Sequence, residues 1–141
     1  MVHALSLEQI TDTATIVERA KLALRFSQSR VLRVTRVRFD AADRRHALEE
    51  VVLVLDHFSG LAPNGGDVPD IIDLAERYGL SLGRATERIS IVPATKDVAL
   101  HLGITAGTDV MKLDRIVETS DGEPVEWRVA YRRIQAGAAY P

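Results

Sequence analysis

Apolar residues recur at helical spacing along the first part of the chain. The members of this pattern are Ile10, Ala14, Val17, Ala20 and Leu24. Steps of three and four residues align such side chains on one stripe of an α-helix. Ser6-Leu7-Glu8-Gln9 resembles a capping box, and Ser27-Gln28-Ser29 interrupts the pattern. The sequence therefore predicts a helix from about Ser6 to Phe26.

The rest of the chain alternates between strand-like and helix-like segments. Strands are predicted over Arg30–Phe39, His46–Leu55, Leu82–Val92, Asp109–Thr119 and from Pro124 to about Ile134. Shorter helices are predicted over Pro69–Tyr78 and Thr95–Leu102, each followed by a glycine. Asp121-Gly122 is a strong hairpin signal between the last two strands. This order predicts the α+β class, with helices packed on a largely antiparallel sheet.

Two segments of the chain resemble each other at an offset of 79 residues. Arg30–Val37 aligns with Asp109–Ile116, so that Arg36 matches Arg115. Glu49 matches Glu126 after a two-residue change in spacing, and Ala20 matches Ala99 in the preceding helices. We interpret this similarity as a duplicated helix-plus-hairpin unit. Its two copies should be related by a pseudo-twofold axis and leave a cleft between them.

Composition narrows the class of protein. The 141 residues suffice for one domain over residues 1–141, and 46% of them are hydrophobic. A formal net charge of −2 gives no general attraction to nucleic acid or to an anionic membrane. The sequence contains neither an apolar run of about 18 residues nor a signal-peptide pattern. The absence of cysteine fits a reducing compartment, so we expect a cytoplasmic protein.

Charged residues continue the apolar faces of the predicted hairpins. Strand alternation places Arg36 and Arg38 on one face with Leu32 and Val34, and Glu49 should lie opposite Arg36 if the first turn is symmetric. In the second hairpin the corresponding charged residues are Arg115 and Glu126. Charges in such places are seldom buried without partners. They either form structural Arg–Glu bridges or line a pocket for an anionic or hydroxylated ligand.

Other residues carry weaker signals. Seven arginines lie between residues 25 and 45, but strand alternation divides them between two faces and no helix-turn-helix accompanies them. Trp127 and Tyr131 share one strand face and are typical of a core, with Tyr131 at a pocket rim. The four histidines lack metal-ligand spacing, and common catalytic motifs are absent. We therefore expect no catalytic residue, no metal and no cofactor.

Three stretches of the sequence resemble the UTRA domain, the effector-binding part of HutC-type GntR transcription regulators. They are Val31–Glu49, Asp70–Gly79 and Ala99–Glu126. The resemblance implies a chorismate lyase-like fold, a pocket for an organic acid, amino acid or sugar-like metabolite, and a homodimer. It places ligand-binding residues at Arg36 and Arg38, and at Glu49 and Glu126. DNA would be contacted only through an attached or separate winged-helix domain.

The chain departs from this family pattern in two ways. The roughly 20 residues before the repeat cannot hold a winged helix, so we expect either a fragment of a regulator or a stand-alone sensor. Phosphosugar-binding relatives tend to carry serine where this chain has Asp70, at the start of a helix. An aspartate there should cap the helix itself and repel an anion, which disfavours phosphorylated sugars.

The sequence leaves three functions open. The favoured one is a ligand-sensing domain that couples a metabolite to transcriptional control. A chorismate lyase-like enzyme is a second, because the fold is shared, although fold alone is a poor guide to function. A ligand-free dimerisation module is the third, since sheet edges can pair with other chains.

Overall fold

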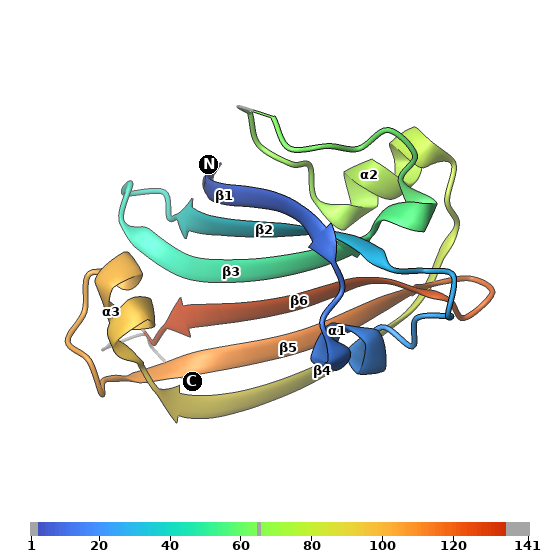
Figure 1. Cartoon of the computed structure of the whole chain (residues 1–141). Coiled ribbons are helices and arrows are strands. Elements are labelled where there is room, and N and C mark those ends of the chain that lie inside the picture. Colours follow the sequence, from blue (N-terminus) through green and yellow to red (C-terminus); the bar gives the residue numbers. More distant parts are fainter. Residues whose placement is uncertain (1–2, 65, 135–141) are drawn as a thin grey trace.

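The computed structural model describes residues 3–64 and 66–134, which form one antiparallel sheet of six strands with three short helices (Figure 1). The sheet order is β1-β2-β3-β6-β5-β4. The strands are β1 (His3–Thr13), β2 (Arg30–Phe39), β3 (Arg45–Val54), β4 (Leu82–Pro93), β5 (Asp109–Thr119) and β6 (Pro124–Arg133). The helices are α1 (Ile16–Lys21), α2 (Ile71–Tyr78) and α3 (Lys96–Leu102), and a 3-10 turn spans Leu55–His57. The predicted α+β class is confirmed.

The long helix predicted from Ser6 to Phe26 is wrong. Residues 3–13 form the edge strand β1, which pairs with β2. Only the six residues of α1 are helical in this region, and they begin after Thr15. The capping box lies at this point too: Thr15 Oγ1 accepts from the Glu18 amide, and Glu18 Oε1 accepts from the Thr15 amide. The later elements lie within two residues of their predicted bounds.

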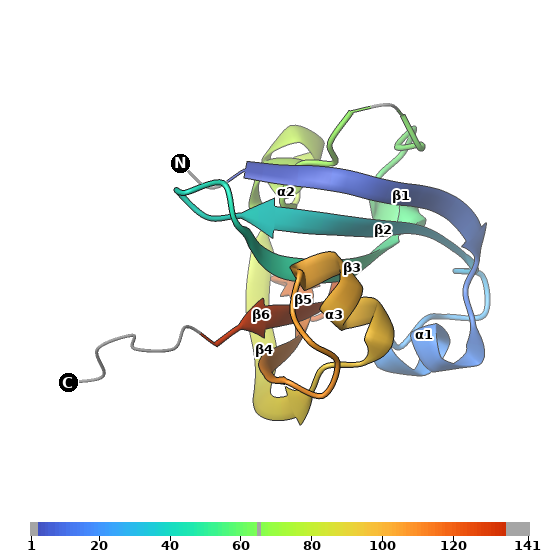
Figure 2. The ribbon, with the colours of Figure 1, turned by 90° about the vertical axis from the view of Figure 1, so that its left-hand side faces the viewer.

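The helices cover opposite faces of the sheet (Figure 2). Helix α2 packs through Ile71 and Leu74 on Leu32 and Val34 of β2, and we call this side the α2 face. On the other side, which we call the α1/α3 face, α3 packs on β2, β3 and β5, and Leu22 beside α1 packs on β2 and β3. Because successive strand residues alternate between faces, even-numbered residues 32–38 of β2 belong to the α2 face.

The duplication is visible in the topology, with a different unit from the one predicted. Each copy contains a strand, a helix and a hairpin: β1-α1-β2-β3 and β4-α3-β5-β6. The helix caps Thr15 and Thr95 correspond at an offset of 80, one more than the hairpins, so Ala20 and Ala99 are not equivalent. The copies meet where β3 pairs with β6. This seam is continuous sheet, so no gap in the sheet separates the copies, and a cleft between them stays a prediction.

Candidate functional site

Arg36 is fixed at the centre of a charged cluster on the α2 face. The β2–β3 register places it directly opposite Glu49, as the symmetric turn predicted. Its Nε donates to Glu49 Oε1 at 2.8 Å, and its Nη1 donates to the Val68 carbonyl at 3.2 Å. Its Nη2 donates to Asp70 Oδ1 at 3.1 Å, and the residue is only 3% exposed. The guanidinium is therefore held by two separate segments of the chain, strand β3 and the stretch that leads into α2.

Arg38 binds the same two carboxylates from the next position on this face. Its Nε lies 2.9 Å from Glu49 Oε1, and its Nη2 donates to Asp70 Oδ1 at 2.5 Å. Burial raises the pKa of Glu49, but the charge and hydrogen bond of Arg36 and the charge of Arg38 outweigh it, and this pKa lies below its usual range. Burial also raises the pKa of Asp70, but the hydrogen bond and charge of Arg38, together with the charges of Arg36 and Arg128, outweigh it, so this pKa is lowered too. Both carboxyls are thus held ionised.

The role predicted for Asp70 requires a correction. It occupies the N-cap position of α2, but its side chain makes no capping hydrogen bond. The carboxylate instead accepts from Arg36 and Arg38, at the end of a helix whose first turn also carries Asp73. An anionic ligand group at these arginines would therefore have to compete with Asp70.

The second copy contributes a looser group of charges. Arg115 Nη2 lies 3.9 Å from Glu126 Oε1, too far for a hydrogen bond. Glu126 is 2% exposed, and this burial raises its pKa above the usual range despite the positive charges of Arg128, Arg115 and Arg36. The Arg115–Glu126 pair is thus much weaker than the Arg36–Glu49 pair.

Arg128 is a member of the cluster that the sequence interpretation missed. Its Nη1 lies 3.7 Å from Glu49 Oε2 across the seam between the copies. On β5 and β6 Arg115 lies opposite Arg128, whereas Val117 lies opposite Glu126. The counterpart of Glu49 at the 79-residue offset is therefore Arg128, and the predicted match with Glu126 is wrong. Extending the offset unchanged across the turn would have identified Arg128.

Three buried polar atoms of this cluster lack a hydrogen-bond partner within residues 3–64 and 66–134. They are Glu49 Oε2, Glu126 Oε1 and Arg115 Nε. Buried polar groups nearly always have such a partner, and leaving one without costs about 1–3 kcal/mol. The cluster therefore offers two acceptors and one donor to a further group.

Tyr131 and Trp127 lie away from this cluster. Both belong to the α1/α3 face, where Tyr131 packs with the core beneath α3 and Trp127 Nε1 donates to Asp114 Oδ1 at 2.9 Å. The sheet thus separates Tyr131 from the other six residues predicted to bind a ligand. Its predicted shared face with Trp127 is correct.

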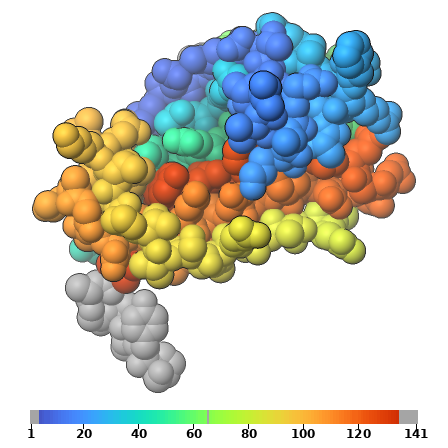
Figure 3. Space-filling model, turned by 60° about the horizontal axis from the view of Figure 1, so that its bottom comes forward, coloured from blue at the N-terminus to red at the C-terminus, as the bar shows by residue number. Residues whose placement is uncertain are grey.

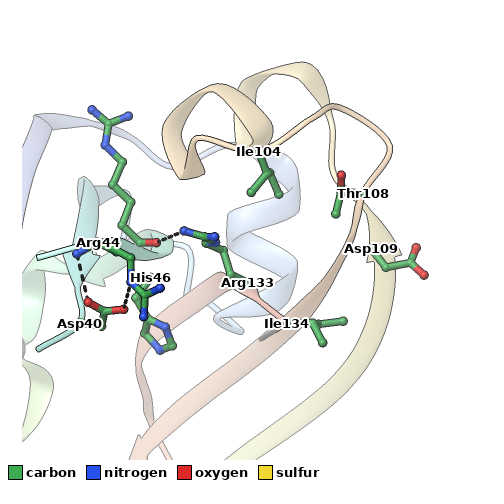
Figure 4. A pocket seen from close by; sticks show the side chains of 9 residues that line it. Asp40, Arg44, His46, Ile104, Thr108, Asp109, Arg133 and Ile134 are labelled. Carbon is green, nitrogen blue, oxygen red and sulfur yellow. Dashed lines mark hydrogen bonds and ion pairs between the residues drawn. The ribbon is translucent and has the colours of Figure 1, made fainter. Parts of the chain in front are cut away.

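A separate pocket of about 380 Å³ lies at one end of the sheet, between the β2–β3 turn, the α3–β5 loop and the end of β6 (Figure 4). Its lining residues are Asp40, Arg44, Arg45, His46, Ile104, Thr108, Asp109, Arg133 and Ile134. None of the predicted site residues lines it. Two of its arginines are already occupied, since Arg45 donates to carbonyls at the end of α3 and Arg133 donates to the Arg45 carbonyl. The pocket is therefore the weaker candidate for a functional site.

Neither a metal site nor a membrane span is found in the part of the chain that the structure describes. No group of three or more His, Cys, Asp or Glu side chains there could hold a metal ion. No helix there is long and apolar enough to cross a membrane.

Comparisons with known proteins agree on one family. The sequence model of the UTRA domain matches residues 2–136. A 57-residue stretch is 39% identical to the HTH-type transcriptional regulator Rv0792c of Mycobacterium tuberculosis, covering 40% of this chain and 21% of that protein.

Solved structures show the same fold. The protein YydK from Bacillus subtilis superposes with a TM-score of 0.84 at 17% identity, over 97% of this chain and 64% of that one. The effector domain of PhnF from Mycobacterium smegmatis superposes with a TM-score of 0.83 at 21% identity, over 94% of this chain and 81% of that one. This chain thus spans under two thirds of YydK and matches about a fifth of Rv0792c.

Proposed function

The chain belongs to the UTRA domain family, and from that premise we propose that its α2-face cluster binds the small-molecule effector of a GntR-type, HutC-like transcription regulator. The cluster consists of Arg36, Arg38, Glu49, Asp70, Arg115, Glu126 and Arg128. Ligand binding there would bias an attached or separate winged-helix domain, which alone contacts DNA. The regulator would act in the cytoplasm as a homodimer.

The observation that carries this proposal is the pair of carboxylate oxygens, Glu49 Oε2 and Glu126 Oε1, that lack a hydrogen-bond partner among the described residues. Glu49 is 0% and Glu126 is 2% exposed, so bulk water solvates neither carboxylate freely. In the free protein each of these buried oxygens lacks a hydrogen bond from the described residues, which costs free energy. A ligand that donates a hydrogen bond to both oxygens would remove this cost on binding. Such a gain is available only to a ligand of matching chemistry, which gives the site specificity.

The same geometry limits the class of ligand. The two glutamates favour hydroxyl or ammonium donors, and the free Nε of Arg115 favours a carboxylate or another acceptor. Asp70 already binds the two first-copy arginines, so it disfavours a phosphate at the start of α2. We therefore propose an unphosphorylated ligand with donors and an acceptor: an amino acid, a hydroxylated organic acid or a sugar.

A thermal-shift screen tests this assignment. Amino acids, hydroxy acids, sugars and sugar phosphates are added to the wild-type chain, and a compound that binds the folded state should raise its melting temperature. Affinity for that compound should fall about tenfold or more in Glu126→Gln, because an amide replaces the carboxyl group that the ligand contacts. The matched control is Glu87→Gln on exposed β4, where binding should be unchanged. Equal shifts in all three proteins would contradict the site assignment, and release of pyruvate from chorismate would indicate an enzyme instead.

A further inference from the structure

The residue before α2 has the backbone of a helix cap without the hydrogen bond of one. Asp70 has φ −62° and ψ 159°, close to the values of Thr15 and Thr95, which cap α1 and α3. Both threonines accept from the amide three residues further on, whereas Asp70 makes no capping bond within the described residues. In α2 the corresponding amide belongs to Asp73. A cap side chain is therefore in place but bonded elsewhere.

Asp70 binds the two arginines of the first copy instead, and it is the exposed one of their two acids. Its Oδ1 atom accepts from both Arg36 Nη2 and Arg38 Nη2. The Asp70 side chain is 50% exposed, whereas that of Glu49 is 0% exposed. If Asp70 leaves, Arg36 keeps its bonds to Glu49 and to the Val68 carbonyl, and Arg38 keeps Glu49. Asp70 can therefore move away while both arginines stay anchored.

Helix α2 is the element that such a movement would affect. Helices α1 and α3 lie on the other side of the sheet, where the space-filling view shows them in blue and gold (Figure 3). In the part of the chain that the structure describes, α2 is the one helix on the α2 face, and its cap residue is bonded to the charged cluster. Glu49 Oε2 in that cluster is buried and has no hydrogen-bond partner among the described residues, so the cluster can accept a further group.

We propose that Asp70 is an exchangeable occupant of the ligand site: a carboxylate ligand replaces it on Arg36 and Arg38, and its side chain then caps α2 by accepting from the Asp73 amide. This exchange replaces one carboxylate by another, so the charge that faces the arginines is unchanged. A phosphate ester carries more negative charge and would lie beside both Asp70 and Asp73, which it would repel. The class of ligand is therefore a carboxylic acid, and its binding acts on the first turn of α2.

This inference rests on the proposed function, because it concerns the same site, and the two can fail separately. A metabolite whose affinity falls in Glu126→Gln, in a protein where Asp70 does not exchange, would keep the effector site and remove the switch. Exchange of Asp70 with a simple carboxylate, in a protein that binds no metabolite in the screen, would keep the switch and remove the effector assignment.

Competition by Asp70 is measured by an NMR titration of the full chain with acetate at constant ionic strength. Acetate has to displace a carboxylate in the wild type but only a neutral group in Asp70→Asn or Asp70→Ser, so its dissociation constant should be at least about tenfold lower in both variants. Asparagine and serine are good helix caps, so both variants should fold. The matched control is Asp73→Asn, which removes a charge from the same exposed turn but, among the described residues, no partner of either arginine. It should change the dissociation constant by less than about threefold. Equal acetate affinity in Asp70→Asn and the wild type, or no acetate binding by that variant, would overturn the proposal.

The second position of Asp70 is measured at the Asp73 amide. Saturation of the wild type with acetate should move the Asp73 amide proton downfield and slow its exchange with water, because the amide gains a hydrogen-bond acceptor. Asp70→Ala also frees the arginines and should bind acetate more tightly than the wild type does. It has no side-chain acceptor for the cap, so its Asp73 amide should stay unchanged. An unmoved Asp73 amide in the saturated wild type, or an equal shift in Asp70→Ala, would overturn the switch.

Discussion

Glu49 is the residue on which the charged cluster depends. Its Oε1 atom binds the Nε atoms of Arg36 and Arg38, and its Oε2 atom faces Arg128. Taking a carboxylate out of water is costly, and only close cationic partners compensate for it. The lowered pKa of Glu49 shows that its partners outweigh this penalty. The cluster should therefore be sensitive to the loss of Glu49, the fully buried one of the two acids that Arg36 and Arg38 share.

Replacement of that acid should therefore be severe. Glu49→Gln keeps the shape but leaves buried Arg36 with only half-exposed Asp70 as a counter-charge, so we expect the free energy of unfolding to fall by about 3–5 kcal/mol. Urea denaturation at pH 7 measures the change. Glu87→Gln, on an exposed strand without an ion pair among the described residues, should change it by less than about 0.5 kcal/mol. Similar small losses for both variants would mean that the arginines find other partners.

Glu126 should make the folded protein less stable as pH rises. Its pKa is raised in the folded state, so its contribution is fully present below the unfolded pKa and is lost as pH rises through the folded pKa. The Glu126→Gln variant lacks this titrating group. Its free energy of unfolding relative to that of the wild type should therefore increase with pH, by on the order of 1 kcal/mol at neutral pH. Thermal melts from pH 4 to pH 8 measure the difference. A constant difference across this range would show that Glu126 has an ordinary pKa.

The acid-side behaviour of the cluster follows from Glu49 and Asp70. Their pKa values are lowered in the folded state, so their contribution is present above the unfolded pKa and is lost as pH falls through the folded pKa. Glu126 does not share in this loss, because its protonated form is the one that the folded state favours. A fall in pH therefore weakens the cluster through Glu49 and Asp70, and a rise in pH weakens it through Glu126.

The sequence was sufficient to predict some of these residues. Arg36 opposite Glu49 followed from strand alternation and a symmetric turn, both of which are local rules. The bonds of Asp70 to the arginines could not be predicted, because they depend on where the loop before α2 crosses the sheet. The local sequence predicts that Asp70 caps a helix, the commonest role of an aspartate at such a position. In the structure Asp70 instead accepts hydrogen bonds from Arg36 and Arg38.

At the scale of elements, β1 shows that apolar residues can recur at helical spacing without forming a helix. Ile10 of β1 lies at helical spacing from Ala14, Val17 and Leu24, but these residues come from a strand, a linker, a helix and a loop. As an edge strand β1 is partly exposed on both faces, so its alternation is weak. The repeat itself held the correct answer, because Leu82–Val92 shifted back by 79 residues covers residues 3–13. Buried strands such as β3, with its continuous apolar run, were predictable from composition alone.

The start of β4 depends on a close approach that only glycine permits. A Cβ atom on Gly83 would lie 2.7 Å from the Thr119 carbonyl oxygen and 3.0 Å from Ser120 Cα. Gly83→Ala should therefore destabilise the fold by about 1–3 kcal/mol, measured by urea denaturation. At Gly66 the nearest atom would be Asn64 Oδ1 at 3.4 Å, an ordinary contact. Gly66→Ala should be neutral or slightly stabilising, and an equal loss in both variants would refute the steric explanation.

At the scale of the whole molecule, the two copies depend on each other to bury their apolar surfaces. Seven residue pairs of β3 and β6, from Ala47–Arg132 to Leu53–Glu126, form the seam. Helix α2 lies between the copies in sequence, and its core cluster joins β2 and β3 of the first copy to Val117 and Val125 of the second. Each copy therefore buries apolar surface that belongs to the other.

A cut between the copies tests this dependence. A protease site inserted between Ala62 and Pro63, in an exposed loop segment, separates the first copy from the rest of the chain. The two fragments should stay associated after cleavage and co-elute in gel filtration, and each should be unfolded alone. Val52→Asp should abolish the association, because it places a charge in the buried seam opposite Trp127. A fragment that folds alone would show that one copy is a sufficient folding unit.

The seam also determines when the charged cluster can be completed during synthesis. Arg36 and Glu49 share a hairpin and can meet as soon as it leaves the ribosome, whereas Arg128 is added 79 residues after Glu49. At about 5–20 residues per second this delay is roughly 4–16 s. During that interval the nascent chain lacks the strand that pairs with β3 and contributes Arg128, so the charge cluster is incomplete. The charge cluster, and with it the proposed effector site, is therefore completed in a single late event, when β6 docks at the centre of the sheet.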